Sequence, residues 1–289
     1  PASDSAALRR ALAGVRGFLL DFDGVLVLAG RPIPGAPEAL RELERRAVPY
    51  RVVTNTSLMS RATMARRAAA RGVEIPAGRI FTALAASAAW TRRHLPGEAL
   101  FVLGSDDART EFAGQRLLTA GEAAAPDARA AAVVVGDSPE ALSWENVNLA
   151  FRLLHRGARL LAMHRNQWWL TPDGPTIDSG AFVAGLEYAT GGRALVLGKP
   201  SAAFYGEAVA DLSAELAARG VRRPRRADLA MVGDDLGTDI GGGRRAGLRT
   251  VFVRSGKHGD AELAYAARRG RSLPDAVAAS LAEVVAALD

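Results

Sequence analysis

Short apolar runs alternate with amphipathic segments along most of this chain. The apolar runs are typical of buried strands, and they begin at Gly17, Arg51, Leu195, Leu229 and Thr250. The segments between them are typical of helices that pack on a sheet, and they cover 37–46, 60–71, 81–94, 202–219 and a stretch from 241. Strands that alternate with helices in this way predict an α/β fold built on a doubly wound parallel sheet.

A second set of alternating elements lies between Thr54 and Lys199, a stretch too long for one crossover connection. Strand candidates begin at Leu100, Ala131 and Arg159, and a helical pattern covers 143–155. We therefore expect an inserted α/β domain over 98–193, flanked by the breaker-rich segments 95–97 and 190–192. The main domain then consists of 1–97 and 194–289.

Polar side chains follow four of the predicted strands of the main domain at the point where each strand ends. In chain order they are Asp21 and Asp23, then Thr54, Asn55 and Thr56, then Lys199, then Asp234, Asp235 and Asp239. Parallel strands would deliver all of these groups to one rim of the sheet. Phosphoryl transfer needs this inventory: a nucleophile, donors for phosphate oxygens, a cation and metal ligands.

The Asp21-Phe-Asp-Gly stretch carries the most chemistry. Alternation along a strand would put Asp21 and Asp23 on the same side, where the two carboxylates repel each other. A divalent cation is the usual compensation for such a pair. A motif this short is equally well explained, on its own, by a solvated turn at the end of a strand.

Four motifs in order give the chain a resemblance to a known family. Asp21-x-Asp-Gly, Thr54-Asn, Gly198-Lys-Pro-Ser and Gly233-Asp-Asp-x-x-x-Asp resemble the motifs of the haloacid dehalogenase (HAD) superfamily of phosphohydrolases. The segments that begin at Ile33, Val133 and Gly241 resemble its subfamily IIA, which includes p-nitrophenyl phosphatase-like, phosphoglycolate and pyridoxal phosphate phosphatases. Thr56 departs from the pattern, because relatives commonly have a second Asn there. The resemblance implies a Rossmann-like core with an inserted α/β cap domain over its site.

The resemblance also implies a role for each residue of the core motifs. Asp21 is the expected nucleophile and forms an aspartyl-phosphate, and Asp23 is the expected general acid and base. Thr54, Asn55 and Lys199 are expected to bind the phosphate.

Mg²⁺ suits the hard oxygen ligands of this site. Its expected ligands are the carboxylates of Asp21 and Asp234 and the backbone carbonyl of Asp23. Of Asp235 and Asp239, one is expected to support the site and the other to cap the next helix, and we favour Asp239 for the site, as a ligand or behind the ligands.

The segment His164-Arg-Asn-Gln-Trp-Trp follows the last predicted strand of the inserted domain. The corresponding loop in relatives selects the substrate, so Arg165 and Asn166 are candidates for polar contacts, and Trp168 or Trp169 for stacking on a ring. Adjacent tryptophans equally often anchor a loop to a core, and both interpretations stay open.

Composition narrows the possible partners. The 289 residues are 49% hydrophobic and 24% charged, as in soluble globular proteins, and include no cysteine, which excludes disulfides and a thiol nucleophile. The net charge is +6, but the arginines are spread along predicted helices. The densest basic run, 222–226, has no interleaved aromatic residue and is typical of an exposed loop.

The resulting hypothesis is a cytoplasmic, Mg²⁺-dependent phosphatase of a small phosphorylated metabolite, without nucleic-acid or membrane partners. A homodimer is left open. The alternative is a catalytically quiet protein of the same fold that binds phosphate or regulates. A phospho-acceptor receiver domain is disfavoured by the long insertion and by Asp23, which would shorten the life of an acyl phosphate.

Overall fold

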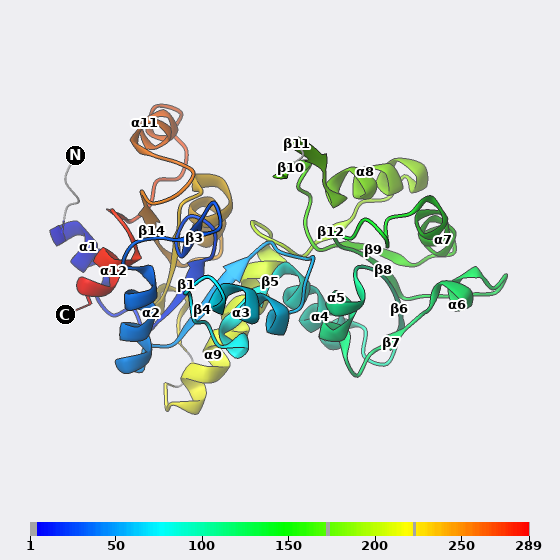
Figure 1. The fold of residues 1–289 in the computed structure, drawn as a ribbon, viewed down its shortest axis with the longest axis horizontal. Helices are drawn as coiled ribbons and strands as arrows, with labels where there is room; N and C mark the ends of the chain where they lie inside the picture. Colours follow the sequence, from blue (N-terminus) through cyan, green and yellow to red (C-terminus); the bar gives the residue numbers. More distant parts are fainter. Residues whose placement is uncertain (1–4, 172–173, 222–223, 289) are drawn as a thin grey trace. The chain divides into compact units, whose positions relative to one another are not determined.

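The computed structural model describes residues 5–171, 174–221 and 224–288, and the chain forms two compact units (Figure 1). The core unit comprises Pro1–Thr54, Met64–Phe81 and Lys199–Asp289, and the inserted unit comprises Asn55–Thr63 and Thr82–Gly198. The chain therefore passes between the units at four peptide bonds: Thr54–Asn55, Thr63–Met64, Phe81–Thr82 and Gly198–Lys199. The predicted limits of the inserted domain, 98–193, lie within the inserted unit and stay a prediction.

The core unit is built on a six-stranded sheet with the order β15-β14-β13-β1-β4-β5. Its strands are β1 (Gly17–Asp21), β4 (Tyr50–Thr54), β5 (Ile80–Thr82), β13 (Leu229–Gly233), β14 (Arg249–Val253) and β15 (Ala276–Ala278). The pairings from β15 to β4 are all parallel, and Leu20 lies opposite Val52 on one side and Val232 on the other. The central strands are buried throughout, which explains why their sequences are continuous apolar runs.

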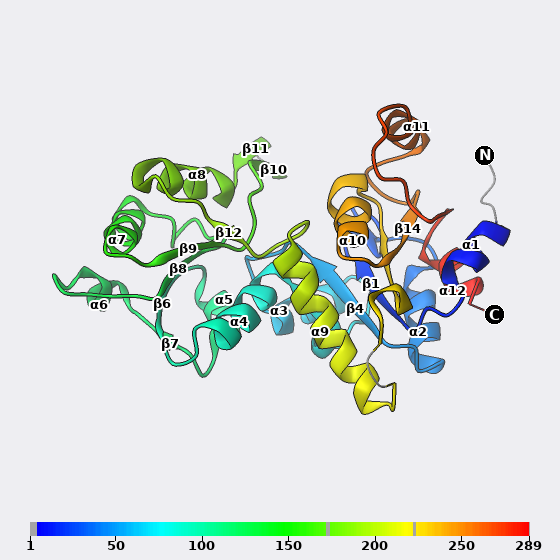
Figure 2. The ribbon, with the colours of Figure 1, turned by 180° about the vertical axis from the view of Figure 1, so that it is seen from behind.

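Helices cover this sheet, and the predicted α/β class is confirmed. They are α1 (Ser5–Leu12), α2 (Ala36–Arg45), α3 (Arg61–Ala69), α9 (Ala202–Ala218), α10 (Gly242–Arg245), α11 (Asp260–Arg268) and α12 (Leu281–Ala286). A small hairpin, β2 (Val27–Leu28) and β3 (Arg31–Pro32), follows β1. The longest helix, α9, packs against β1 and β4 (Figure 2). It begins where the Ser201 hydroxyl accepts a hydrogen bond from the Phe204 backbone N–H.

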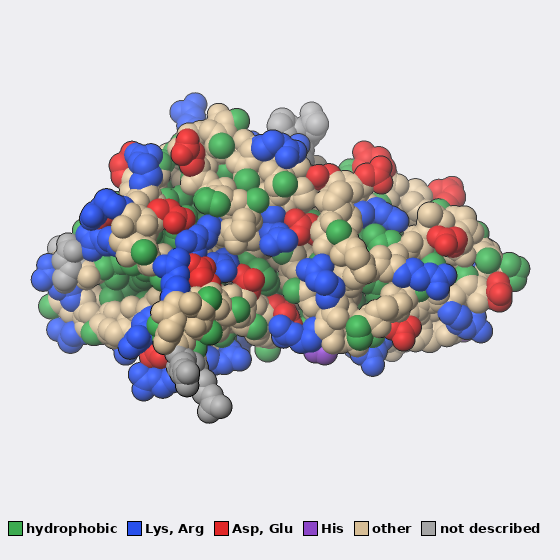
Figure 3. Space-filling view, turned by 90° about the horizontal axis from the view of Figure 1, so that it is seen from below, with side chains coloured by type: hydrophobic (Ala, Val, Ile, Leu, Met, Phe, Trp, Pro, Cys, Tyr) green, Lys and Arg blue, Asp and Glu red, His purple; other side chains and the backbone are tan. Residues whose placement is uncertain are grey.

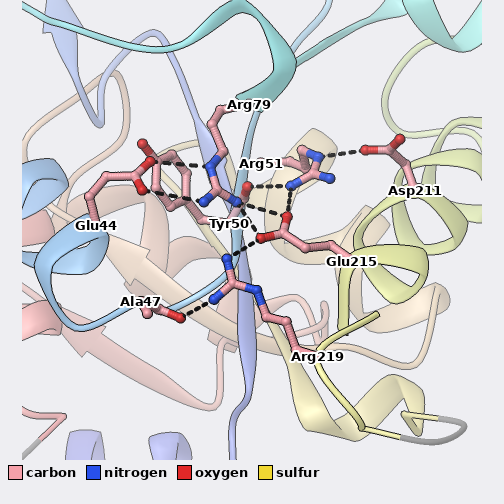
Figure 4. Close-up of polar contacts among 8 residues, drawn as sticks. All are labelled: Glu44, Ala47, Tyr50, Arg51, Arg79, Asp211, Glu215 and Arg219. Carbon is pink, nitrogen blue, oxygen red and sulfur yellow. Dashed lines mark hydrogen bonds and ion pairs between the residues drawn. The ribbon is translucent and has the colours of Figure 1, made fainter. Parts of the chain in front are cut away.

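An ion-pair cluster joins α9 to β4 and its neighbours (Figure 4). The buried Arg51 of β4 donates to Asp211 at 2.5 Å and to Glu215 at 2.6 Å, both on α9. Arg79 and Arg219 also donate to Glu215, at 2.8 and 2.6 Å. Burial raises the pKa of Glu215, but the guanidinium groups of Arg51 and Arg79 outweigh it and hold that pKa below its ordinary value. Glu215 thus accepts from three arginines at once.

The inserted unit has its own parallel sheet, with the order β12-β9-β8-β6-β7. Its strands are β6 (Ala99–Leu103), β7 (Arg116–Leu117), β8 (Ala132–Val135), β9 (Arg159–Ala162) and β12 (Leu195–Val196). Its helices are α4 (Ala83–His94), α5 (Asp106–Arg109), α6 (Ala120–Ala124), α7 (Trp144–His155) and α8 (Ser179–Thr190), and a hairpin pairs β10 (Trp168–Thr171) with β11 (Gly174–Ile177). Phe101, Val133, Leu153 and Leu186 are among the side chains of its apolar core.

The assignment of β12 corrects a prediction. The run from Leu195 was expected to be a strand of the main sheet, but β12 pairs with β9, with Leu195 opposite Leu161 and Val196 opposite Ala162. The run is two strand residues long and wholly apolar, so nothing in it distinguishes one parallel sheet from another. Backbone pairing decides the sheet, and after this run the chain returns to the core unit at Lys199.

The charged side chains on the surface agree with the prediction that the arginines lie on solvated helix faces. No helix within the described ranges is long and apolar enough to cross a bilayer. On the face shown in Figure 3, Lys and Arg side chains are interspersed with Asp and Glu. Of the basic run 222–226, residues 222 and 223 lie outside the described part of the chain. Arg225 pairs with Asp228, and Arg226 donates to the carbonyl of Ala246.

Candidate active site

The candidate site lies where β1 ends, in the middle of the core sheet. The strand β1 lies between β13 and β4, so the connections from it and from β13 lead to opposite sides of the sheet. In doubly wound sheets this switch point, at the carboxyl ends of the strands, is where ligands bind. Asp21 is the last residue of β1, and Asp234 directly follows β13.

Lys199 lies between two buried carboxylates. Its ammonium Nζ is 2.7 Å from Oδ1 of Asp21 and 2.8 Å from Oδ1 of Asp239, and all three side chains are buried. Burial would lower the pKa of Lys199, but Asp21 and Asp239 raise it well above its ordinary value, so the ammonium stays protonated. Burial and the charge of Asp239 raise the pKa of Asp21, against the opposing effect of Lys199.

The carboxylate of Asp234 is held in a space made by two glycines. A Cβ on Gly24 or on Gly256 would overlap this carboxylate, and Gly24 has a φ of 80°, which strains any other residue. The backbone N–H of Lys257 donates to Oδ2 of Asp234 at 2.5 Å. Glycine at both positions is therefore what allows Asp234 to be enclosed, and burial raises the pKa of its carboxyl.

Asp21, Asp234 and Asp239 together fit a metal ion. Each is buried, and each offers a carboxylate oxygen within 4.8 Å of the oxygens of the other two. Lys199 is the ammonium that this group shares, so three negative charges meet one positive charge in a buried place. Carboxylate oxygens in such an excess suit a hard divalent cation.

The other two predicted acidic residues differ in position. Asp23 lies beyond the end of β1, where it forms an isolated β-bridge with Val27, and is exposed. The strand alternation expected to pair it with the buried Asp21 therefore does not reach it. Desolvation by the surrounding protein still raises its pKa. Asp235 caps the following helical turn, Leu236–Gly241, by accepting from the N–H groups of Gly237 and Thr238 at 2.8 and 2.9 Å. Burial raises the pKa of Asp235, but these hydrogen bonds and Lys257 lower it to about 2.

The predicted phosphate-binding residues fall on both sides of a unit boundary. Thr54 is the buried last residue of β4, and Lys199 is the first core residue after the insertion. Asn55 and Thr56 belong to the inserted unit.

The predicted selectivity loop lies in the inserted unit, between β9 and β10. Arg165 donates to the buried Glu187 of α8 at 2.9 Å, so its guanidinium has a partner within the unit. Trp168, the first residue of β10, is 60% exposed, and the side chain of Trp169 lies outside the description. The backbone of Asn166 contacts α8, where its carbonyl accepts from the N–H of Gly180 at 3.0 Å.

Three residues around the site were not predicted. The Lys257 backbone holds Asp234, the Ser255 hydroxyl donates to the carbonyl of Gly24 at 2.7 Å, and the Tyr205 hydroxyl donates to the carbonyl of Thr238 at 2.8 Å. The nearest sequence signal is that Ser255 and Lys257 follow a predicted strand at the same rim. Tyr205 offers no such signal, because it reaches the site from the face of α9.

Comparison with known proteins decides the family. A haloacid dehalogenase-like hydrolase model matches residues 18–117, and a HAD-hydrolase-like model matches residues 196–284. Haloacid dehalogenase-like hydrolase domain-containing protein 2 of Bos taurus is 35% identical over 252 residues, which cover 87% of this chain and 88% of that protein. This chain belongs to the haloacid dehalogenase-like hydrolases.

Two further similarities narrow the position within the HAD family. Human phospholysine phosphohistidine inorganic pyrophosphate phosphatase is 34% identical, over 85% of each chain. The structure of p-nitrophenyl phosphatase from Archaeoglobus fulgidus superposes with a TM-score of 0.81 at 28% identity, covering 95% of this chain and 99% of that one. The predicted resemblance to the HAD superfamily and its p-nitrophenyl phosphatase-like members is confirmed, and the chain is an enzyme of HAD type.

Proposed function

We propose that this HAD hydrolase removes the phosphoryl group from a small phosphorylated metabolite through an aspartyl-phosphate intermediate. The chain is a HAD-type hydrolase of phosphoric monoesters, as the names of its relatives indicate. The observation that carries the proposal is the buried carboxylate of Asp21, bonded to Lys199 and placed beside Asp234 at the switch point of the sheet.

Asp21 is proposed as the nucleophile. Its Oδ1 accepts hydrogen bonds from Lys199 and from the backbone N–H of Phe22, each at 2.7 Å. These bonds fix the carboxylate, and Oδ2 is the oxygen proposed to attack phosphorus. Attack by Oδ2 forms the acyl phosphate and expels the alcohol, and water then cleaves the new bond.

Asp23 is proposed as the general acid and base. It lies two residues beyond the nucleophile and is exposed, so it can reach a leaving group or a water molecule. Its raised pKa keeps the carboxyl protonated at a higher pH than an ordinary aspartic acid. It would give this proton to the departing oxygen and then take one from the attacking water.

Thr54, Asn55 and Lys199 are proposed to bind the phosphoryl oxygens. Thr54 and Lys199 are buried, and a charge-assisted hydrogen bond is strong in such a place. The ammonium of Lys199 would also offset the charge that approaches Asp21.

Mg²⁺ is the proposed cofactor, held by the carboxylates of Asp21 and Asp234, with the backbone carbonyl of Asp23 as a further ligand. When bound, it would neutralise phosphate charge that otherwise repels these acids. Asp239 contacts Lys199 directly and would either ligate the ion or orient Lys199. Asp235 caps the adjacent turn and is not assigned to the ion.

Hydrolysis of p-nitrophenyl phosphate by the purified protein tests the proposal, with Asp21→Asn as the matched variant. We expect turnover by the native protein and none above background by the variant. A catalytically quiet phosphate-binding protein would instead bind inorganic phosphate and release no p-nitrophenol from either form. That result would overturn the enzymatic proposal in favour of the alternative.

The roles of the selectivity residues are proposed from the family resemblance and from their exposure. Arg165, Asn166 and Trp168 are proposed to face the part of the substrate beyond the phosphate, and the exposed indole of Trp168 supports stacking on a ring. A cytoplasmic location, the absence of a nucleic-acid partner and a homodimer stay predictions from the sequence.

A further inference from the structure

A buried cluster of polar side chains ties the segment after Thr54 to the sheet of the inserted unit. Ser57 and His164 are 2% and 3% exposed, and the Ser57 hydroxyl oxygen lies 3.0 Å from Nε2 of His164. The same oxygen accepts from the backbone N–H of Asp137 at 2.9 Å. His164 and Asp137 follow β9 and β8, so one serine bridges the carboxyl ends of two neighbouring strands.

The contacts of the imidazole are consistent with its neutral form. The Asn166 backbone N–H donates to Nδ1 of His164 at 3.4 Å, so the proton of the neutral ring lies on Nε2, which donates to the Ser57 oxygen. That oxygen has two lone pairs and can accept from Asp137 as well. Burial lowers the pKa of His164, against the opposing charge of Asp178, which favours the neutral ring. The Ser179 hydroxyl lies 3.4 Å from Nδ1 and 3.5 Å from Nε2 of the same ring.

The rest of the segment is held in the same unit. Asp107 of α5 accepts from the Ser60 backbone N–H at 2.8 Å and from the Thr63 hydroxyl at 2.9 Å. The Ser105 hydroxyl donates to the carbonyl of Leu58 at 2.9 Å. Residues 55–63 therefore follow the inserted unit, although Thr54 just before them belongs to the core sheet.

Asn55 packs against Gly198, the last residue of the inserted unit. A Cβ on Gly198 would lie 2.8 Å from Oδ1 of Asn55 and would overlap the carbonyl of Met163. The side chain of Asn55 thus packs on a glycine that directly precedes Lys199, and Met163 directly precedes His164. The amide of Asn55 is positioned by the same part of the inserted unit that holds Ser57.

We infer that Ser57 and His164 are positioning residues for phosphate binding, which act by holding Asn55 in the inserted unit. Neither residue needs to touch the substrate. This inference rests on the proposed function, because it takes Asn55 as a phosphate donor.

Inhibition of p-nitrophenyl phosphate hydrolysis by inorganic phosphate tests this inference, because phosphate probes the donors without a leaving group. Ser57→Ala should raise the inhibition constant of phosphate about tenfold, as expected for a displaced hydrogen-bond donor. Ser87→Ala is the matched control, since Ser87 is also buried in this unit and its hydroxyl is also hydrogen-bonded there, to the carbonyl of Ala83. The control should match Ser57→Ala in thermal midpoint and leave the inhibition constant within about twofold.

A double-mutant cycle separates positioning from a merely structural role. If Ser57 acts through Asn55, Asn55→Ala alone should weaken phosphate binding about tenfold, and adding Ser57→Ala should weaken it less than about twofold further. An equal loss in both backgrounds, or a Ser57→Ala variant that behaves like Ser87→Ala, would overturn the inference and leave the proposed function intact. If Asn55→Ala leaves the inhibition constant of phosphate unchanged, both the assignment of Asn55 and this inference are wrong. Turnover that depends on Asp21 would still support the proposed function.

Two substitutions of His164 give a second readout. Gln places its side-chain amide near the position of Nε2, and Asn places one near that of Nδ1. His164→Gln should therefore keep the phosphate inhibition constant within about threefold of native, and His164→Asn should resemble Ser57→Ala. The opposite order would show that Ser57 is not held through Nε2 and would overturn the role given to His164.

Discussion

The guanidinium of Arg165 lies 2.9 Å from Oε2 of Glu187, whose side chain is 5% exposed. The other oxygen of this carboxylate accepts from the backbone N–H of Ala194 at 2.8 Å. Arg165 therefore balances a buried charge on α8, next to the chain that leads into β12. Its effect on a substrate, proposed from the family pattern, cannot be measured without also disturbing this pair.

Arg165→Ala should lower the free energy of unfolding by about 1–3 kcal/mol, because it leaves the buried carboxylate of Glu187 without its close partner. Urea unfolding at constant m-value measures the loss. Adding Glu187→Gln to Arg165→Ala should recover part of it, since Gln keeps an acceptor for Ala194 and removes the charge. A double variant that loses the sum of the two single effects would contradict this account.

Trp168→Ala is the cleaner probe of substrate selection, because the indole is 60% exposed. We expect a change in unfolding free energy below about 0.5 kcal/mol. The kcat/KM for the native metabolite should fall more than that for p-nitrophenyl phosphate, which can make few contacts beyond its phosphate. Equal losses on both substrates at unchanged stability would remove Trp168 from the selectivity role.

Asp21→Asn should lower kcat by about a thousandfold or more while the fold is retained, since the amide has nearly the shape of the carboxylate and can still accept from Phe22. Asp23→Asn should be most severe for substrates whose alcohol is a poor leaving group, because these depend on the proton. Steady-state kinetics with alkyl and aryl phosphates measures both. Near-native rates in Asp21→Asn would exclude the covalent mechanism.

Removal of divalent ions should abolish turnover, and Mg²⁺ should restore it, because three buried carboxylates otherwise repel the phosphate. Ca²⁺, which is larger and coordinates more flexibly, should inhibit. Full activity in excess chelator would contradict the metal assignment.

The stabilising effect of Mg²⁺ should grow with pH. Burial raises the pKa of Asp21 and Asp234 above 3.8, so without metal these acids favour folding below that pH. Their contribution is lost as pH rises through the raised values. Mg²⁺ binds the ionised form, so it should raise the thermal midpoint more at about pH 7 than at about pH 5. Equal shifts at both pH values would place the binding of Mg²⁺ elsewhere.

Glu215→Gln should destabilise the protein by about 1–3 kcal/mol, because three guanidinium groups share this carboxylate. The control is Asp211→Asn, on the same helix, which pairs with Arg51 and is 46% exposed, and it should cost less than about 1 kcal/mol. Chemical unfolding of the two variants measures the difference. Similar losses of unfolding free energy would mean that the three contacts of Glu215 stabilise the protein no more than the single Arg51–Asp211 pair does.

The sequence predicts best where a local pattern and its position on the sheet coincide. Asp21 and Asp234 follow long buried runs, so their arrival at one rim could be predicted from the runs alone. Lys199 was also placed correctly near Asp21, although the strand before it was assigned to the wrong sheet.

Long-range partners explain what was not predicted. The ring of His164 meets a serine 107 positions earlier in the chain, and Arg165 finds its partner on α8. The local sequence around His164 and Arg165 does not indicate whether either side chain makes a structural contact or contacts the substrate. The same is true of Gly256, whose requirement for a bare backbone arises only because Asp234 lies against it.

The place where the chain crosses between units also sets how the insertion could be exchanged with that of a relative. A graft limited to 98–193 would take the residue at position 164 from the relative and keep Ser57 of this chain. The two partners of a buried hydrogen bond would then come from different proteins. A graft of 55–63 together with 82–198, which keeps the core segment 64–81 in place, would carry both partners, the asparagine beside them and the glycine on which it packs. The graft would then transfer the residues proposed for substrate selection and one proposed phosphate donor together.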